Sequence, residues 1–95
     1  MRLERTGIAG SMESGDILIE LEQTQTEGID IELNSTVNNQ YGKQIKAAIE
    51  TTLLACGIQS AHVRAVDKGA LDCTIRARVT AAAHRGANDD AFHWE

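Results

Sequence analysis

Ser14 is the residue of this chain whose type and setting best fit a chemical role. It lies in the small, polar segment of residues 9–16 (AGSMESGD), where Gly10 and Gly15 bracket it. Nucleophilic catalysis by a serine requires a base within hydrogen-bonding reach and an oxyanion site, and the Gly-x-Ser-x-Gly signature is absent. A covalent attachment needs only an accessible hydroxyl on a flexible backbone. Taken by itself, a lone serine in a glycine-containing loop is usually an ordinary loop residue.

The other chemistry-bearing side chains predict neither a catalytic nor a metal site. His62, His84 and His93 have no His, Cys or carboxylate partner at metal-ligand spacing. Cys56 and Cys73 are too few for the disulfide framework of a secreted protein. Both cysteines are expected to pack as small core residues.

The size and charge of the chain limit its function. Its 95 residues predict one domain, residues 1–95, and favour a carrier or binding module over a self-sufficient enzyme. Its net charge of −5 argues against nucleic-acid binding, which needs clustered Lys and Arg. Because the chain has no membrane-spanning apolar run and no signal-peptide core, we expect a cytoplasmic protein without membrane contact.

Charge is distributed unevenly along the chain. Residues 1–34 contain eight acids and two bases, whereas residues 60–86 contain two acids and five bases. This difference suggests two surfaces that face different protein partners. Solvated faces of an ordinary domain would explain the same counts.

Period-two alternation predicts two strands after the serine segment. Residues 17–22 (ILIELE) and 29–34 (IDIELN) each place an apolar residue at every second position, as in strands with one buried face. The polar segment 23–28 between them ends in a glycine, and we expect it to close a hairpin.

The apolar period then changes to that of a helix. One stripe at helical spacing contains Tyr41, Ile45, Ala48, Ile49, Thr52, Leu53 and Cys56. Lys43, Lys46 and Glu50 lie on the opposite side, which is typical of an amphipathic helix. Gly57 follows the last apolar position, where a left-handed C-terminal cap is expected.

Alternation returns after this helix, over residues 61–65 and 73–80, and predicts a second hairpin with its turn at residues 67–69. Arg76 and Arg78 would then share one strand face. The predicted fold is α+β and two-layered: a four-stranded antiparallel sheet in β-β-α-β-β order, packed by one long helix.

The ends of the chain are expected to lie outside this core. Residues 1–16 would be a mobile attachment segment, since they bury few apolar groups. Residues 17–80 would form the folded core. Residues 81–95 would be a tail, with a short helix over residues 81–85 that ends at Gly86.

Two parts of the chain together resemble the acyl carrier (gamma) subunit of citrate lyase. The first part is the segment Ala-Gly-x-x-Glu-Ser-x-Asp, which here supplies Glu13, Ser14 and Asp16. The second part is the run of residues 67–73 (DKGALDC) with residues 75–78 (IRAR). The resemblance extends over nearly the whole chain.

The resemblance implies that Ser14 carries a covalent arm, 2′-(5″-phosphoribosyl)-3′-dephospho-coenzyme A, joined through a phosphodiester. Glu13 and Asp16 would either help a transferase to recognise the serine or only keep the loop soluble. Residues 67–72 would form a simple turn or a docking patch for larger subunits. Arg76 and Arg78 would be solvated or would meet the phosphates of the arm.

The resemblance also implies a non-catalytic subunit of a lyase complex. The alpha subunit would exchange acetyl for citrate on the arm. The beta subunit would cleave the citryl thioester to oxaloacetate and regenerate acetyl thioester. A prosthetic-group transferase and an acetate ligase would be further partners. The alternatives are the acyl carrier (delta) subunit of malonate decarboxylase and an unmodified α/β interaction domain.

Overall fold

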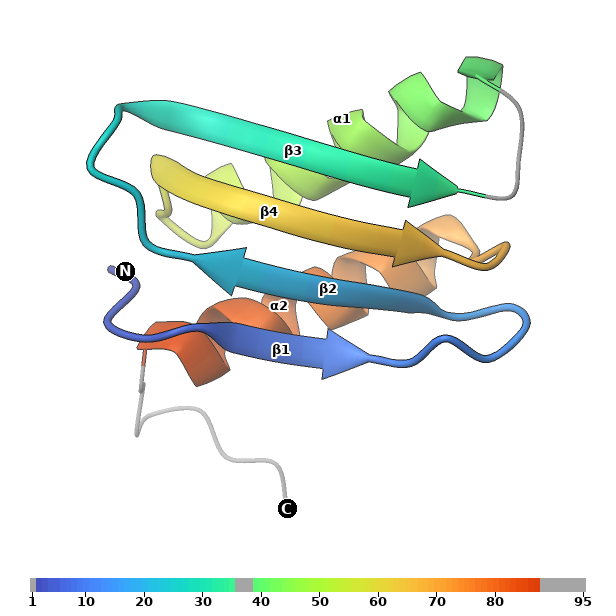
Figure 1. Cartoon of the computed structure of the whole chain (residues 1–95), viewed down its shortest axis with the longest axis horizontal. Helices are drawn as coiled ribbons and strands as arrows, with labels where there is room; N and C mark the ends of the chain where they lie inside the picture. The colour runs from blue at the N-terminus through green and yellow to red at the C-terminus, as the bar shows by residue number, and fades with distance from the viewer. Residues whose placement is uncertain (1, 36–38, 88–95) are drawn as a thin grey trace.

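The chain folds into a four-stranded sheet with two helices on one side, as the computed structural model shows (Figure 1). The structure describes residues 2–35 and 39–87. In chain order the elements are β1 (Gly7–Gly10), β2 (Ile17–Glu22), β3 (Gly28–Ser35), α1 (Asn39–Ala55), β4 (Ser60–Asp67) and α2 (Asp72–Ala87). The predicted α+β, two-layer class is therefore confirmed.

The strands are arranged in the order β1-β2-β4-β3. β2 pairs antiparallel with both β1 and β4, whereas β3 pairs parallel with β4. A parallel pair needs a crossover connection, and α1 provides it. The two strands predicted at 17–22 and 29–34 are present, but the hairpin between them is wrong because β4 lies between β2 and β3.

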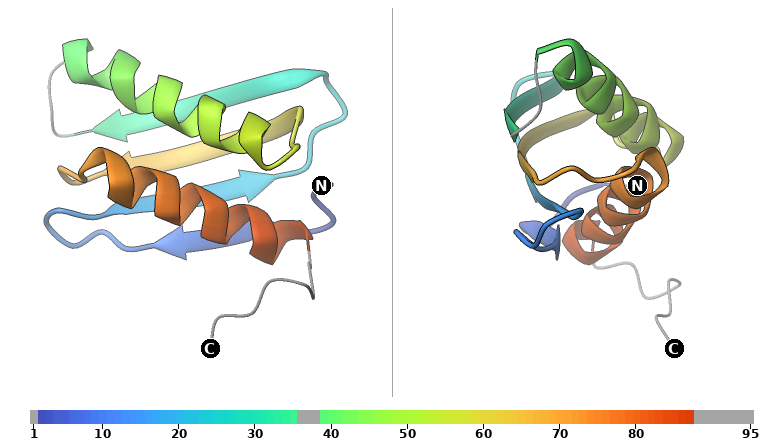
Figure 2. Two further views of the ribbon diagram at one scale, coloured as in Figure 1. Left: turned by 180° about the vertical axis from the view of Figure 1, so that it is seen from behind. Right: turned by 90° about the vertical axis from the view of Figure 1, so that its right-hand side faces the viewer.

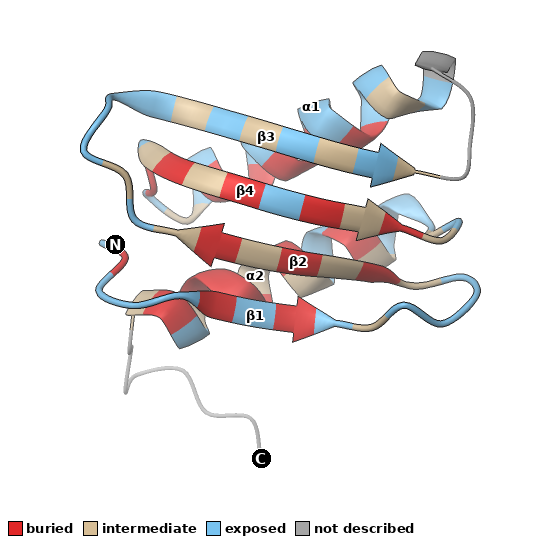
Figure 3. Ribbon diagram, viewed as in Figure 1, coloured by how far each residue is buried: buried red, intermediate tan, exposed pale blue. Residues whose placement is uncertain are grey.

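Both helices cover the same face of the sheet, and no described element lies on the other face (Figure 2). Residues alternate accordingly along β2, where Ile17, Ile19 and Leu21 are fully buried under the helices and the residues between them are half-buried. The edge strand β3 contains no buried residue, only half-buried and exposed ones in alternation (Figure 3). The core thus lies between β2, β4 and the two helices.

The predicted long helix is confirmed as α1. Of its apolar stripe, Ile45, Ile49 and Leu53 are buried. The helix ends at the expected glycine, since Gly57 has φ +80°. The Ile58 N–H donates to the Leu53 carbonyl at 2.9 Å, and the side chain of Ile58 is buried. This is the hydrogen-bonding pattern of a Schellman cap with its apolar contact.

The predicted strand at 73–80 is wrong, and with it the β-β-α-β-β order and the fully antiparallel sheet. These residues belong to α2, whose buried residues are Ile75, Val79, Ala81, Ala82, Ala83 and Gly86. Ile75 and Val79 fit both periods, because they are four residues apart. Cys73 and Ala77, which a strand would have buried, are exposed. The run of small residues after Val79 can pack on the sheet only if the helix continues through it.

The folded core also begins earlier than residue 17. Ala9 in β1 and Leu3 before it are both buried in the hydrophobic core. Residues 81–87, expected in the tail, complete α2, and residues 88–95 lie outside the described part of the chain. No helix among the described residues is long and apolar enough to cross a membrane.

Candidate functional site

Residues 11–16 form the loop that joins β1 to β2, and Ser14 lies in it. The loop leaves β1 at Gly10, which pairs with Leu18 and has φ +92°. A Cβ at this position would lie 1.8 Å from the Ile17 carbonyl oxygen, so no other residue fits without a shift of the backbone. Gly10 therefore fixes where the loop begins.

A tight turn places Ser14 at the surface. The Asp16 N–H donates to the Glu13 carbonyl oxygen at 3.0 Å, which makes Ser14 and Gly15 the two central residues of the turn. Gly15 has φ +85°, the left-handed conformation that type II turns require at this position. Ser14 is exposed, and its hydroxyl forms no hydrogen bond with any residue that the structure describes.

Asp16 ties this turn to the body of the protein. Its carboxylate accepts hydrogen bonds from Ser11 Oγ at 2.8 Å and from the Ile17 N–H at 2.7 Å. Arg78 of α2 binds both carboxylate oxygens, with Nε at 3.0 Å and Nη2 at 3.3 Å. The Arg78 hydrogen bond, helped by those of Ser11 and Ile17 and opposed by partial burial, lowers the pKa of Asp16 to about 2.

Two backbone hydrogen bonds join the turn to the β4–α2 connection. The Gly15 N–H donates to the Lys68 carbonyl oxygen at 2.7 Å, and the Lys68 N–H donates to the Asp16 carbonyl oxygen at 2.9 Å. Asp67 beside it is only 1% exposed and accepts hydrogen bonds from Ser35 Oγ and the Ala70 N–H. The two sequence segments that were singled out, residues 9–16 and 67–73, are therefore neighbours in the fold.

The structure brings Glu13, Ser14 and Asp16 together in one turn but gives them different surroundings. Asp16 points inward, and its side chain is 15% exposed. Glu13 and Ser14 are both exposed. An inward carboxylate with four internal hydrogen bonds fits a structural role, so Glu13 is the acid of this turn that remains accessible to another molecule.

Arg76 and Arg78 do not share a strand face as expected, because both lie on α2. Arg76 Nε binds Asp72 at 2.7 Å, one helical turn away, while Arg78 reaches Asp16. Sequence reasoning missed the contact of Arg78 with the loop. The spacing of four between Asp72 and Arg76 is a helical signal that would have argued against the strand.

The arrangement suits attachment better than catalysis. In the described part of the chain no base or oxyanion site lies at Ser14, so nothing there activates its hydroxyl. No group of three or more His, Cys, Asp or Glu side chains among those residues could hold a metal ion. The space beside Gly15 is open, with no atom within 4 Å of a Cβ built there. Ser14 is itself exposed, so a group bonded to its Oγ would project toward solvent.

Comparison with known proteins gives one consistent family. Residues 4–86 match the family model described as malonate decarboxylase delta subunit (MdcD). Citrate lyase acyl carrier proteins from Streptococcus equi subsp. equi (strain 4047) and Streptococcus uberis (strain ATCC BAA-854 / 0140J) are 46% and 48% identical over 95 residues, covering 100% of this chain and 93% of each relative.

A solved structure has the same fold. In a crystal structure of a Pseudomonas malonate decarboxylase hetero-tetramer in complex with malonate, one chain superposes with a TM-score of 0.61. The match covers 86% of this chain and 88% of that one, at 20% sequence identity. At this identity the likeness concerns the fold alone.

Proposed function

The chain belongs to the acyl carrier family of citrate lyase and malonate decarboxylase, and we propose that it is the acyl carrier subunit of a citrate lyase. In this role it carries acetyl and citryl groups between the acyl transferase (alpha) and citryl lyase (beta) subunits while citrate is cleaved to acetate and oxaloacetate. The observation that carries the proposal is the exposed Ser14 hydroxyl, without a hydrogen bond to the described residues, at the tip of an anchored turn.

Ser14 is the proposed attachment point of the 2′-(5″-phosphoribosyl)-3′-dephospho-coenzyme A arm, through a phosphodiester at Oγ. The open surroundings of the turn support the fit. When attached, the arm supplies a terminal thiol that holds the acyl group as a thioester. The serine hydroxyl then serves as an anchor, and the chain contributes no catalytic group of its own to this proposed cycle.

The neighbouring residues hold and present the serine. Asp16 and Arg78 fix the base of the turn to α2, while Lys68 fixes it to the β4–α2 connection. Tethering the acyl group at a defined point keeps its concentration high at both catalytic subunits. Exposed Glu13 is the acid that we assign to recognition by the prosthetic-group transferase.

We further propose that the mobile part of the attachment segment is short. Gly15 and Asp16 are hydrogen-bonded to Lys68, and residues 7–10 are paired with β2, so mobility is expected mainly over residues 12–14. Backbone amide order parameters should be lowest there. Uniformly rigid values from residue 9 to residue 16 would contradict this.

The wider setting follows from the same family. A single acyl carrier domain would work in the cytoplasm with the alpha and beta subunits, the prosthetic-group transferase and the acetate ligase. The malonate decarboxylase delta subunit is the second candidate, because the matching family model carries that description. The citrate system is preferred, since the citrate lyase carriers match the full chain at 44–48% identity.

Intact mass tests the attachment. The chain is produced with and without an active prosthetic-group transferase and its activated arm. We expect a mass gain equal to one whole arm, and Ser14→Ala should abolish it. Ser11→Ala, which removes the other serine of the loop, should keep it. An unchanged mass of the native chain, with a transferase that modifies a known carrier, would leave only the unmodified interaction domain.

Reconstitution separates the two carrier systems. The arm-bearing chain is mixed with citrate lyase alpha and beta subunits or with the corresponding malonate decarboxylase subunits. Citrate-dependent formation of oxaloacetate in the first mixture supports the proposal. Turnover only in the malonate mixture would replace it by the second candidate.

A further inference from the structure

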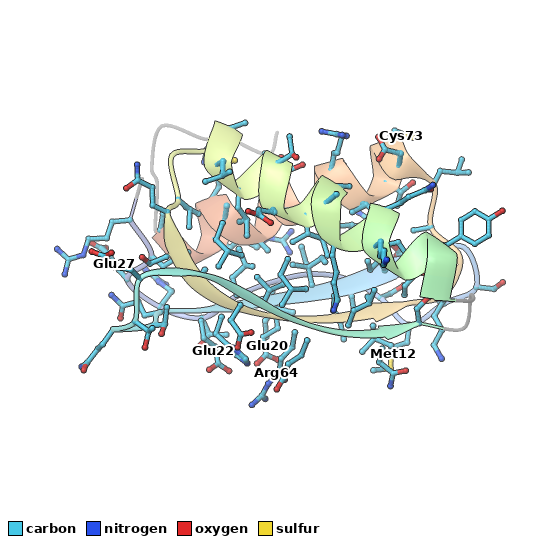
Figure 4. All side chains as sticks on the ribbon, turned by 90° about the horizontal axis from the view of Figure 1, so that it is seen from above. Met12, Glu20, Glu22, Glu27, Arg64 and Cys73 are labelled. Carbon is cyan, nitrogen blue, oxygen red and sulfur yellow. The ribbon has the colours of Figure 1, made fainter. Side chains whose placement is uncertain are left out.

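The face of the sheet opposite the helices, here called the open face, is not covered by any helix or strand among residues 2–35 and 39–87 (Figure 2). Alternation along the strands assigns its residues: Ile8 of β1, Leu18, Glu20 and Glu22 of β2, Asp30, Glu32 and Asn34 of β3, and His62, Arg64 and Val66 of β4. In Figure 4 the side chains of Glu20, Glu22 and Arg64 extend away from both helices. The open face is thus formed by alternate residues of all four strands.

One end of the open face is apolar and adjoins the loop of Ser14. Leu18 pairs with Val66 on one side and with Gly10 on the other, and Gly10 is the residue from which the loop departs. Met12 belongs to the loop, is 58% exposed, and lies on the same side as Glu20 and Arg64 in Figure 4. A sheet face that only meets water is normally polar throughout, so this apolar end needs another explanation.

The rest of the open face is acidic. Four carboxylates, those of Glu20, Glu22, Asp30 and Glu32, share it with the Arg64 guanidinium and with His62, whose ring nitrogens lie 3.0 Å from Asp30 and 3.5 Å from Glu32. The separations from Arg64 to Glu20, Glu22 and Glu32 are 3.8, 3.9 and 3.5 Å. Exposed ion pairs are weak, and the side chains of Asp30 and Glu32 are 78% and 64% exposed, so these carboxylates remain available to positive groups of another molecule.

Basic side chains gather instead in the helical layer. Lys43 and Lys46 are exposed on α1, and Arg76 is exposed on α2. The uneven charge of the sequence therefore becomes a difference between two layers, with the acidic side also bearing the apolar end next to Ser14. A partner of complementary charge would be directed to the open face and away from the helices.

The surface of the open face is hollowed beside Arg64. A shallow hollow of about 190 Å³ lies over β3 and β4 and includes Glu32, Asn34, Arg64 and Val66 in its lining. Its apolar side at Val66 and its acidic side at Glu32 match the two parts of a Lys or Arg side chain, whose stem packs on apolar surface while its charged head meets a carboxylate.

We propose that the open face is the surface by which this chain docks on a catalytic subunit of its complex, and that the matching surface of that subunit has an apolar end beside a region of Lys and Arg. This rests on the proposed function. Docking there would leave Ser14 at the edge of the interface, from which an attached arm reaches into the subunit. Electrostatic complementarity would set the orientation and the association rate.

The test uses the folded, ¹⁵N-labelled chain and the purified alpha and beta subunits of citrate lyase. On titration with the subunit that binds, amide signals of Leu18, Glu20, Arg64 and Val66 should broaden first, while those on the outer sides of α1 and α2 keep their width. Affinity should fall as salt is raised from low to physiological concentration.

Paired charge reversals make the test sharper. Glu20→Lys with Glu32→Lys should weaken binding about tenfold or more, whereas Lys43→Glu with Lys46→Glu on α1 should leave it within about twofold. Met12→Gln tests the apolar end and should weaken binding by about threefold or more. Dispersed amide spectra check that each variant is folded. If a variant is unfolded, the pattern of signal broadening in the native chain still tests whether the open face is the docking surface.

Three other results would overturn the open face as the docking surface on a catalytic subunit. Broadening confined to the helices, or equal loss from both charge reversals, overturns the open face as the docking surface while the carrier function stands. Concentration-dependent self-association through the open face, seen by sedimentation, would assign it to a second copy of the chain instead. Binding to neither subunit, with the native chain folded and bearing its arm, overturns the proposed function and this inference with it.

Discussion

Asp16 shows how a single side chain can join distant parts of a small protein. Its carboxylate connects its own loop, through Ser11, to α2, through Arg78, 62 residues away in sequence. The exposed serine two residues earlier depends on this anchor for a defined position. The proposed attachment point and the acid that anchors its loop therefore lie only two residues apart in sequence.

Loss of the Asp16 carboxylate should change the acid stability of the protein. Because its pKa in the folded state, about 2, lies below the ordinary value of 3.8, the stabilisation is present above about pH 4 and is lost as the pH falls to about 2. Asp16→Asn should lower the free energy of unfolding at pH 7 by about 1 kcal/mol. Urea unfolding at pH 7, 4 and 2.5 measures both effects.

The Asp16→Asn variant should also lose less free energy of unfolding than the native chain between pH 4 and pH 2.5, because it has no carboxylate at residue 16 to protonate. Glu13→Gln is the matched control, since Glu13 is exposed in the same turn, and its pH dependence should equal that of the native chain. An identical acid profile for Asp16→Asn and the native protein would contradict the assigned role of Asp16.

At the scale of the elements, the contact between β1 and α2 depends on two glycines. A Cβ on Gly7 would lie 2.0 Å from the Ala82 carbonyl oxygen, so the strand and the helix approach each other backbone to backbone. The last turn of α2 is also bound to the N-terminal segment, because the Gly86 carbonyl oxygen accepts hydrogen bonds from the Glu4 and Arg5 N–H groups. The segment before β2 is held in the fold by these contacts.

Two helical glycines should respond to alanine in opposite ways. A Cβ on Gly86 would lie 2.7 Å from Leu3 Cδ2 and 3.0 Å from the Arg5 carbonyl oxygen. Gly86→Ala should therefore destabilise the protein by about 1–2 kcal/mol.

A Cβ on Gly42 would meet only Leu33 Cδ2, at 3.8 Å, and Gly42→Ala should stabilise the protein by about 0.5–1 kcal/mol. Thermal or urea unfolding of the two variants decides this, and destabilisation by Gly42→Ala would contradict the packing described for α1.

At the scale of the whole molecule, one hydrophobic core between the sheet and the helices supports a chain of only 95 residues. A small domain buries a smaller share of its surface than a large one, so each core side chain matters more to its stability. The open face adds nothing to this core. Its residues are available for interaction at no cost in folding.

Two neighbouring leucines of α1 test the location of the core. Leu53 is fully buried, whereas Leu54 is 52% exposed. Leu53→Ala should lower the free energy of unfolding by about 2–5 kcal/mol. Leu54→Ala should change it by about 0.5 kcal/mol or less. Chemical denaturation measures both, and similar losses for the two variants would be incompatible with the face that α1 buries.

The elements with local signals were predictable from the order of residues alone. The alternation in residues 17–22 and 29–34 predicted β2 and β3, and the long apolar stripe with Gly57 predicted α1 and its cap. The proposal of Ser14 as an attachment point likewise rests on residue types at short spacing. Local hydrogen bonding and one-sided burial leave such patterns directly in the order of residues.

The remaining features depend on contacts between distant segments. Ile75 and Val79 fit the period of a strand and of a helix alike, and the choice of helix depends on packing against β1 and β2. The insertion of β4 between β2 and β3, and the bond from Arg78 to Asp16, join residues far apart in the chain. Such long-range pairings depend on which apolar faces meet in space, and that information is not contained in any single segment.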